Sequence, residues 1–360
     1  MACEKAGRKS VAEARQLTAV LAAVKWYLKT HYQRPTDPGM PAMFCDPERV
    51  GRFAVDEKAL RRGDPASLFR TLIATTMFQR RQDQQIMRVL RHMPPRDALE
   101  VSDSEMLLAL VDGAECDLVK SNATLLSGCD LAKDPTTRLG CCAARPGIAC
   151  HLKRHTVALK RYGHFGKVPT SAALALREAG VTTLSGLRTQ VLRRHSDPVE
   201  RAAALEMALS RSWRISQKIA CMFLATVATP DLSWPTAPWS RGVDWTRFVV
   251  IDSNVDRFLV SIGYRGRMTY DARRDFVLRI SGEINLCSLD RRIKHAYNPR
   301  LVQQAMYAFM SASNRRALPE DCMHEPSACG RCPGALRERC PVRHQDRQSD
   351  GARSGRMRAG

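Results

Sequence analysis

Four cysteines near the C-terminal end of the chain have the spacing of a metal or cluster site. They are Cys322, Cys329, Cys332 and Cys340, in the pattern Cys-x6-Cys-x2-Cys-x7-Cys-Pro. Neighbouring thiolates repel one another unless a cation binds them, so the pattern favours a soft metal or an iron–sulfur cluster. Structural zinc sites prefer gaps of about two to four residues within each ligand pair, and the first gap here is wider. A [4Fe–4S] cluster is therefore the first interpretation and zinc the alternative.

The charge of the chain indicates a polyanionic partner. Among 360 residues, 57 are Lys or Arg and 36 are Asp or Glu, which gives a formal net charge of +21. The surplus is spread along the sequence, and such a field attracts nucleic acid with an affinity that depends on salt. The alternative is a basic protein with no such partner.

The remaining cysteines suggest a reducing compartment. The chain has 13 cysteines and no export signal that we can identify, so a disulfide framework is not expected. Cys221 lies in an apolar run and is interpreted as a buried thiol, whereas Cys141, Cys142 and Cys150 match no ligand spacing. No run of about 18 apolar residues suggests a membrane span. We expect a cytoplasmic protein, associated with the nucleoid if its source is bacterial.

Apolar residues recur at helical spacing in almost every periodic segment. Such stripes run over residues 14–28, 68–76, 215–227 and 301–309. Only Phe248-Val249-Val250-Ile251 has the composition of a short strand. The sequence therefore predicts an all-α protein.

Two stretches resemble the endonuclease III family, the helix-hairpin-helix DNA glycosylases that carry a C-terminal [4Fe–4S] loop. One is Arg-Ile-Ser-Gln-Lys-Ile-Ala, residues 214–220, and the other is Val-Ile-Asp-Ser-Asn-Val-Asp-Arg, residues 250–257. The cysteine loop has the family's place at the end of the chain. On this resemblance, Lys218 corresponds to the nucleophilic lysine and Asp252 to the second catalytic group.

The resemblance implies base removal coupled to cleavage of the strand at the abasic site. A lysine amine attacks the sugar only when it is neutral, and burial beside cations such as Arg211 and Arg214 favours that form. Asp252 would stabilise positive charge on the sugar or move a proton. Surface exposure of Lys218 and a capping role for the 252–256 stretch are the structural alternatives; Ser253-x-x-Asp256 resembles a capping box.

Further segments of the chain are similar to the family in the same order. Residues 68–83 resemble its early barrel helix, with Met77 at the position of a serine and Gln79 at that of the glutamine that enters the base stack. Residues 166–169 resemble its Gly-x-Val-Pro segment. Gln79 is expected to fill the gap left by an extruded base, and a solvated side chain at a helix end is the alternative.

The chain also departs from the family pattern. Arg214 and Ser216 stand where the hairpin has glycines, Trp213 replaces a proline, and Asn254 replaces a histidine. Residues 177–211 are inserted relative to the family. We expect Arg214 and Ser216 to contact DNA. One alternative to an enzyme is a non-catalytic DNA-binding protein with the same scaffold, and another is a zinc-stabilised nucleic-acid adaptor.

The resemblance implies a two-domain helix-hairpin-helix fold. Residues 1–62 would form an N-terminal helix and linker that pack with the C-terminal domain. Residues 63–247 would form the helical barrel, 248–342 the C-terminal helical domain with the iron–sulfur loop, and 343–360 a disordered basic tail. We expect a monomeric DNA repair enzyme acting on double-stranded DNA. The damaged base is not specified by the sequence.

Overall fold

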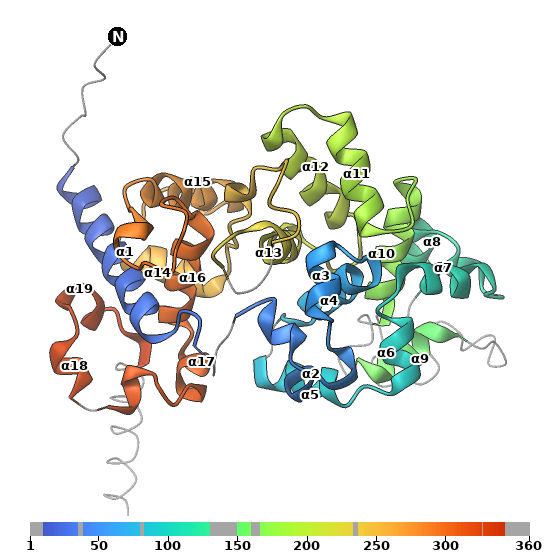
Figure 1. Cartoon of the computed structure of the whole chain (residues 1–360), viewed down its shortest axis with the longest axis horizontal. Coiled ribbons are helices and arrows are strands. Elements are labelled where there is room, and N and C mark those ends of the chain that lie inside the picture. The colour runs from blue at the N-terminus through green and yellow to red at the C-terminus, as the bar shows by residue number, and fades with distance from the viewer. Residues whose placement is uncertain are drawn as a thin grey trace, which may run out of the picture. The chain divides into compact units, whose positions relative to one another are not determined.

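The computed structural model describes residues 10–34, 39–79, 83–129, 150–159, 166–232, 237–325 and 327–342. The chain forms two compact units, and each is described by itself (Figure 1). Unit 1 comprises residues 1–37 and 251–360, and unit 2 comprises residues 38–250. The expected all-α class is confirmed, because the described residues contain helices and no strand. The short strand expected at residues 248–251 does not form; this buried segment carries the chain from unit 2 into unit 1.

Unit 2 contains most of the helices. They are α2 (Pro47–Val50), α3 (Glu57–Arg62), α4 (Pro65–Met77), α5 (Asp83–Arg91), α6 (Pro95–Glu100), α7 (Ser104–Asp112), α8 (Asn122–Ser127), α9 (His151–Ala158), α10 (Lys167–Glu178), α11 (Leu184–Arg194), α12 (Pro198–Ser210) and α13 (Gln217–Ala228), with short 3-10 helices η1 (Ala42–Cys45), η2 (Gly51–Phe53), η3 (Asp117–Val119) and η7 (Trp245–Arg247).

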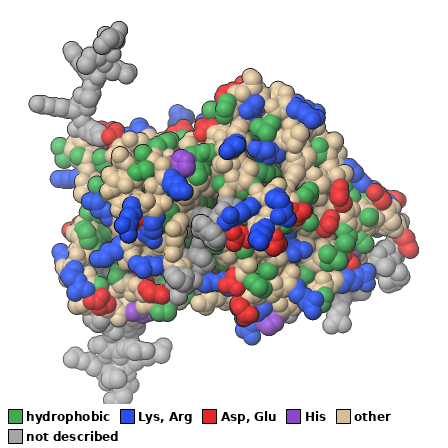
Figure 2. Space-filling model, in the orientation of Figure 1, with side chains coloured by type: hydrophobic (Ala, Val, Ile, Leu, Met, Phe, Trp, Pro, Cys, Tyr) green, Lys and Arg blue, Asp and Glu red, His purple; other side chains and the backbone are tan. Residues whose placement is uncertain are grey.

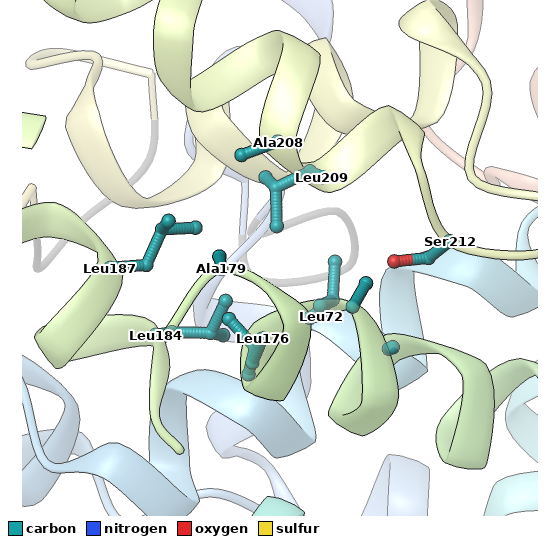
Figure 3. Close-up of a pocket in the computed structure, with 10 residues that line it drawn as sticks. Leu72, Leu176, Ala179, Leu184, Leu187, Ala208, Leu209 and Ser212 are labelled. Atoms are coloured by element: carbon teal, nitrogen blue, oxygen red, sulfur yellow. The ribbon is translucent and has the colours of Figure 1, made fainter. Parts of the chain in front are cut away.

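The core of unit 2 is built around α13, which is buried along nearly its whole length. Every residue from Ile219 to Ala228 is buried, as expected for a central helix that is apolar on all sides. It packs against α4 and α12. A small cavity of about 10 Å³ lies near α12, lined mainly by the alkyl side chains that Figure 3 labels, among them Leu72, Leu187 and Leu209. A space of this size with an apolar lining stays dry, so it is a packing defect rather than a ligand site.

Unit 1 is assembled around one amphipathic helix. Its helices are α1 (Val11–Thr30), α14 (Ser253–Ser261), α15 (Tyr270–Ser281), α16 (Pro299–Met310), α17 (Ala312–Ala317), α18 (Ala328–Arg331) and α19 (Gly334–Arg337), with 3-10 helices η8 (Leu286–Ser288) and η9 (Cys322–His324).

Helix α16 contacts α1, α14 and α15, so it is the centre of unit 1. Its Phe309 is packed edge-on by Trp26 of α1 and by Phe258 of α14, with ring centroids 5.4 and 6.1 Å apart. Such aromatic pairs each add about 0.5–1.5 kcal/mol beyond area burial. The N-terminal helix and the segment after residue 251 therefore share one core.

The division of the chain falls at places other than the expected boundaries. The first observed division follows Asp37, because α2 packs on α5 and helps to bury Val50 and Phe53 within unit 2. The last division follows Val250, close to the expected residue 247. The basic tail, residues 343–360, lies outside the described residues. In the part of the chain that the structure describes, no helix is both long and apolar enough to span a bilayer.

Candidate functional site

The turn between α12 and α13 carries the residues that the sequence places at the hairpin. Arg214 has φ +62°, in the left-handed region that favours glycine. Ser216, at the second glycine position, has an ordinary extended backbone with φ −75°. An arginine in the left-handed region costs roughly 1 kcal/mol relative to glycine. The turn thus keeps one glycine-like bend and places a long cation there.

Three side chains from earlier helices hold the backbone of this turn. Gln79 Nε2 donates to the carbonyl of Arg214 at 3.2 Å, and Asn122 Nδ2 donates to the carbonyl of Arg211 at 3.1 Å. The amide of Trp213 donates to Ser171 Oγ at 2.7 Å. Ser171 in turn donates to Asn122 Oδ1 at 2.6 Å. Since these bonds come from the residue that follows the C-cap of α4, from the start of α8 and from within α10, the turn is fixed by the body of unit 2.

The outer side of the turn is cationic and lacks a cap. The guanidinium of Arg214 is exposed and lies over the Trp213 ring at 5.3 Å, and the buried Lys167 amine lies 5.2 Å from the same ring. Ser216 is the N-cap residue of α13, but its side chain accepts no hydrogen bond from the described first turn. A helix N-terminus of this kind attracts anions such as phosphate. Gln79, Arg214 and Ser216 therefore gather at one end of α13, as a shared DNA contact would require.

Lys218 stands on the first turn of α13 and is half-buried. Among the described residues, its amine makes no hydrogen bond and no ion pair. The residues that follow it, Ile219 and Ala220, are fully buried. The amine is thus available to a ligand and is not committed to a structural contact.

Asp252 belongs to unit 1 and is the N-cap of α14. Its Oδ1 accepts from the amides of Asn254 at 3.0 Å and Val255 at 2.9 Å. The capping role considered for this stretch is therefore present, but Asp252 performs it. The box expected from Ser253 and Asp256 does not form, because Ser253 is already inside the helix and Asp256 pairs with Arg273. The two amide bonds fix the orientation of the Asp252 carboxylate.

A buried arginine lies near Asp252 that sequence reasoning missed. Arg300, in the first turn of α16, is 4% exposed, and its guanidinium donates to Gln303 and Gln304. Burial lowers the pKa of Arg300, and the electrostatic interactions with Tyr27 and Asp252 partly oppose this. The Nε atom of Arg300 has no hydrogen-bond partner among the described residues. An arginine in the first turn of a helix usually faces solvent, so no sequence signal marks it.

The four C-terminal cysteines lie close to one another in unit 1. Burial raises the pKa of the Cys332 thiol, and the neighbouring thiols of Cys322, Cys340 and Cys329 raise it further. All four are half-buried and reduced. Four neighbouring sulfurs are a donor set that a bound cation or cluster would stabilise.

The spacing of these sulfurs is wider than a single zinc ion requires. Zinc–sulfur bonds of about 2.3 Å in a tetrahedron place the sulfurs about 3.8 Å apart. Within the described residues, no three cysteine sulfurs lie within 4.8 Å of one another. The four sulfurs therefore do not form a closed tetrahedral site for a single ion as they stand.

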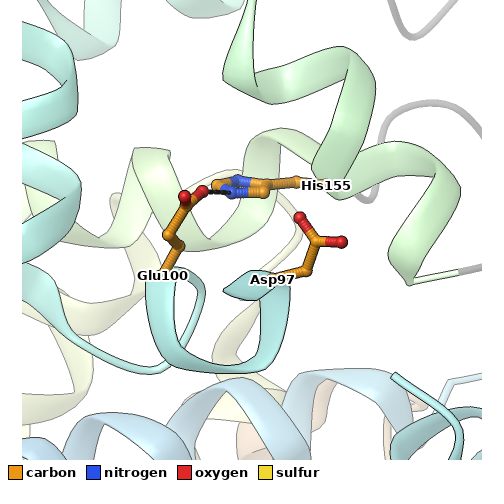
Figure 4. Close-up of side chains that lie close together, drawn as sticks. All are labelled: Asp97, Glu100 and His155. Carbon is orange, nitrogen blue, oxygen red and sulfur yellow. Dashed lines mark hydrogen bonds and ion pairs between the residues drawn. The ribbon is translucent and has the colours of Figure 1, made fainter. Parts of the chain in front are cut away.

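A second group of polar residues is buried in unit 2, between α6 and α9. Asp97, Glu100 and His155 have their ligand atoms within 4.8 Å of one another, and His155 bonds Glu100 at 2.9 Å (Figure 4). Arg154 pairs with both carboxylates, and Arg96 pairs with Glu100. Burial opposes ionisation of Glu100, yet the bonds from His155 and the arginines lower its pKa to about 2. The carboxylates are thus neutralised by protein cations, as in a structural ion-pair network.

The other cysteines considered in the sequence fall in different places. Cys221 is buried in α13 as expected, and its thiol donates to Glu206 at 3.2 Å. Cys150 is the N-cap of α9, whereas Cys141 and Cys142 lie outside the described residues. The inserted segment, 177–211, forms α11 and α12 and so supplies the first helix of the turn described above.

Basic side chains are spread over the visible face of the molecule and interspersed with acidic ones (Figure 2).

Comparison with known proteins adds no assignment: no protein-family model matches the chain, nor does any curated protein or solved structure.

Proposed function

We propose that the protein is a DNA repair glycosylase with associated AP-lyase activity, acting on double-stranded DNA through a lysine Schiff base. The observation that carries the proposal is the turn before α13. There, Gln79 is hydrogen-bonded to Arg214, and Lys218 presents an uncommitted amine on the next helical turn. The resemblance of the hairpin and cysteine loop to the endonuclease III family supplies the reaction class.

In this proposal the turn binds one strand through its backbone. Arg214 and the open N-terminus of α13, with Ser216 as its N-cap, would contact a phosphate. Gln79 is half-buried and anchored through Thr76 and Arg214, so little side-chain entropy would be lost when it enters the base stack. Insertion of Gln79 into the vacated gap would offset the free-energy cost of unstacking the extruded nucleotide, which is a few kcal/mol.

Lys218 would then attack the anomeric carbon of the deoxyribose. The Nζ–C1′ bond forms as the bond from C1′ to the base breaks, and the base leaves with its electron pair. Loss of the amine proton and opening of the sugar give a Schiff base. Removal of a C2′ proton then expels the 3′ phosphate and cleaves the strand. Asp252, held by two amides, would stabilise the positive charge on the sugar or move these protons.

The cysteines Cys322, Cys329, Cys332 and Cys340 would hold a [4Fe–4S] cluster. Its role in the proposal is structural, because it would fold a loop that presents Arg331 and Arg337 towards phosphates. Zinc is the alternative occupant, and the wide sulfur spacing argues against it.

Borohydride trapping tests the proposal directly. Wild-type protein incubated with duplexes that carry a panel of damaged bases and abasic sites should form a covalent complex, which Lys218→Ala should abolish. Lys58→Ala, which removes an exposed lysine from α3, is the matched control and should trap normally. A Lys218→Ala protein that still cross-links would refute the assignment of the nucleophile.

A non-catalytic DNA-binding protein is the second candidate function. The observation that favours it is the replacement of the hairpin glycines, since an arginine at the bend suits charge-mediated binding more than close backbone approach. That candidate predicts duplex binding with a steep salt slope and no trapped complex on any substrate.

A further inference from the structure

The largest fully buried side chain among the described residues is a cation. Arg315, in α17, is 1% exposed and heads the set of fully buried side chains by size. Taking a guanidinium out of water costs several kcal/mol, so its position must be stabilised by specific partners. These partners are one carboxylate and two cysteine sulfurs.

The charge of Arg315 is matched by one acidic residue. Its Nε donates to Asp321 Oδ2 at 2.9 Å and its Nη2 to Asp321 Oδ1 at 3.1 Å, a two-point contact. His31 Nε2 lies 2.9 Å from Asp321 Oδ2. Both carboxylate oxygens of Asp321 are therefore held by these two side chains.

The remaining donors of Arg315 point at the cysteine loop. Nη2 lies 3.4 Å from Cys322 Sγ, and Nη1 lies 3.5 Å from Cys340 Sγ. Arg315 thus contacts the first and the last cysteine of the loop with one rigid, planar group.

Helix α1 supplies a third donor to the same place. The guanidinium of Arg315 lies over the Trp26 ring at 4.8 Å. The indole N–H of Trp26 is buried beside the Cys322 thiol and has no hydrogen-bond partner among the described residues. A buried N–H beside a thiol is an unsatisfied donor, and a metal-bound thiolate would be a charged acceptor for it.

We propose that Arg315 is the positioning residue of the cluster site: it fixes the spacing of Cys322 and Cys340, donates to both sulfurs, and ties the loop to α1 through Asp321 and His31. The inference rests on the cluster assigned under the proposed function. An iron–sulfur cluster with four thiolates is anionic, so a buried donor cation stabilises its more reduced, more negative state and raises its reduction potential. Asp321 offsets part of the charge and keeps the guanidinium fixed.

The test compares purified full-length variants by iron and sulfide content, cluster loss under a chelator, and reduction potential. Arg315→Met alone leaves Asp321 buried without its cation, so the double variant Arg315→Met with Asp321→Asn is made as well. Arg315→Lys keeps the charge but loses the fork. Arg316→Met, at the exposed neighbouring position of α17, is the control.

We expect wild type and the Arg316→Met control to hold about four irons per chain. The double variant should lose its cluster at least about tenfold faster and show a lower reduction potential in the fraction still loaded, with Arg315→Lys intermediate in both. A folded double variant with wild-type retention and potential would overturn the proposal, as would an iron-free wild type. Borohydride trapping reports separately on Lys218, so failure of the glycosylase proposal and failure of the Arg315 proposal are distinguishable.

Discussion

The side-chain amide of Gln79 donates to the backbone carbonyl of Arg214, which lies 135 residues further along the chain, at a distance of 3.2 Å. The bond joins the end of α4 to the turn before α13. It brings the residue expected to enter the base stack and the residue expected to contact phosphate to one place in unit 2. The bond uses the Nε2 donor of Gln79, so the amide oxygen of the same side chain takes no part in it.

Gln79→Ala should slow base extrusion more than it weakens binding. The side chain that fills the gap is lost, and about 1–3 kcal/mol of offset to unstacking corresponds to a roughly tenfold to hundredfold lower rate of borohydride trapping. Affinity for undamaged duplex should change less than threefold. Gln84→Ala, an exposed glutamine on α5, serves as the control. Equal losses in trapping and in undamaged-duplex binding would assign Gln79 to the stability of the turn.

Two substitutions of Arg214 should separate the cost of its strained backbone from the loss of its DNA contact. Arg214→Gly relaxes the left-handed bend and should stabilise the fold by up to about 1 kcal/mol, whereas Arg214→Ala keeps the strain and should not. Both variants remove one phosphate contact, so the slope of log affinity against log salt should fall by about one. Urea unfolding and fluorescence titration at several salt concentrations measure the two effects. An unchanged salt slope in both variants would exclude Arg214 as a phosphate contact.

Acid should destabilise unit 2 between pH 6.5 and 4 through His151. Burial, with the nearby charges of His155 and Arg154, lowers the pKa of His151 to about 4, and the charge of Glu100 partly opposes this. In the unfolded chain His151 then binds a proton below about pH 6.5, whereas in the folded unit it binds one only below about pH 4. Stability is therefore fully present above pH 6.5 and falls as pH decreases, by at most about 3 kcal/mol for this residue.

The measurement is the free energy of opening of unit 2, from hydrogen exchange of amides in α9 and α13 between pH 7 and 4. His151→Asn should flatten the dependence, and the exposed His92→Asn should leave it unchanged. His155, whose pKa burial also lowers, accounts for the part that persists. A His151→Asn protein with the full wild-type slope would show that this histidine is not the group that titrates.

Sequence patterns predicted what depends on neighbours along the chain. Helical periodicity predicted the all-α class, and the apolar run around Cys221 predicted the buried thiol that α13 contains. The short run Phe248–Ile251 was wrongly interpreted as a strand, because strand pairing needs a partner that the sequence does not reveal. The position of the N-cap at Asp252 was one residue from the box expected at Ser253.

The buried polar groups could not be predicted in the same way. His31 meets Asp321 across 290 positions, and Glu100 meets His155 across 55. Each of these residues looks like an ordinary polar side chain in its local sequence. Their roles arise from packing between helices that are distant along the chain, which periodicity does not encode.

Arg300 is predicted to cost stability and support activity at once. Its guanidinium is buried beside Gln303 and Gln304, and its Nε lacks a partner among the described residues. Replacing such a cation by an apolar side chain of similar shape is neutral or stabilising, so Arg300→Met should leave the melting temperature unchanged or raise it. Since Asp252 interacts with this charge, the same change should lower the trapping rate about tenfold without weakening duplex binding. Arg291→Met, at an exposed position of unit 1, is the control. A residue retained for chemistry should give a variant that is as stable as wild type or more stable, and slower in trapping. A destabilised Arg300→Met protein with normal trapping would instead mean that the arginine serves the fold alone.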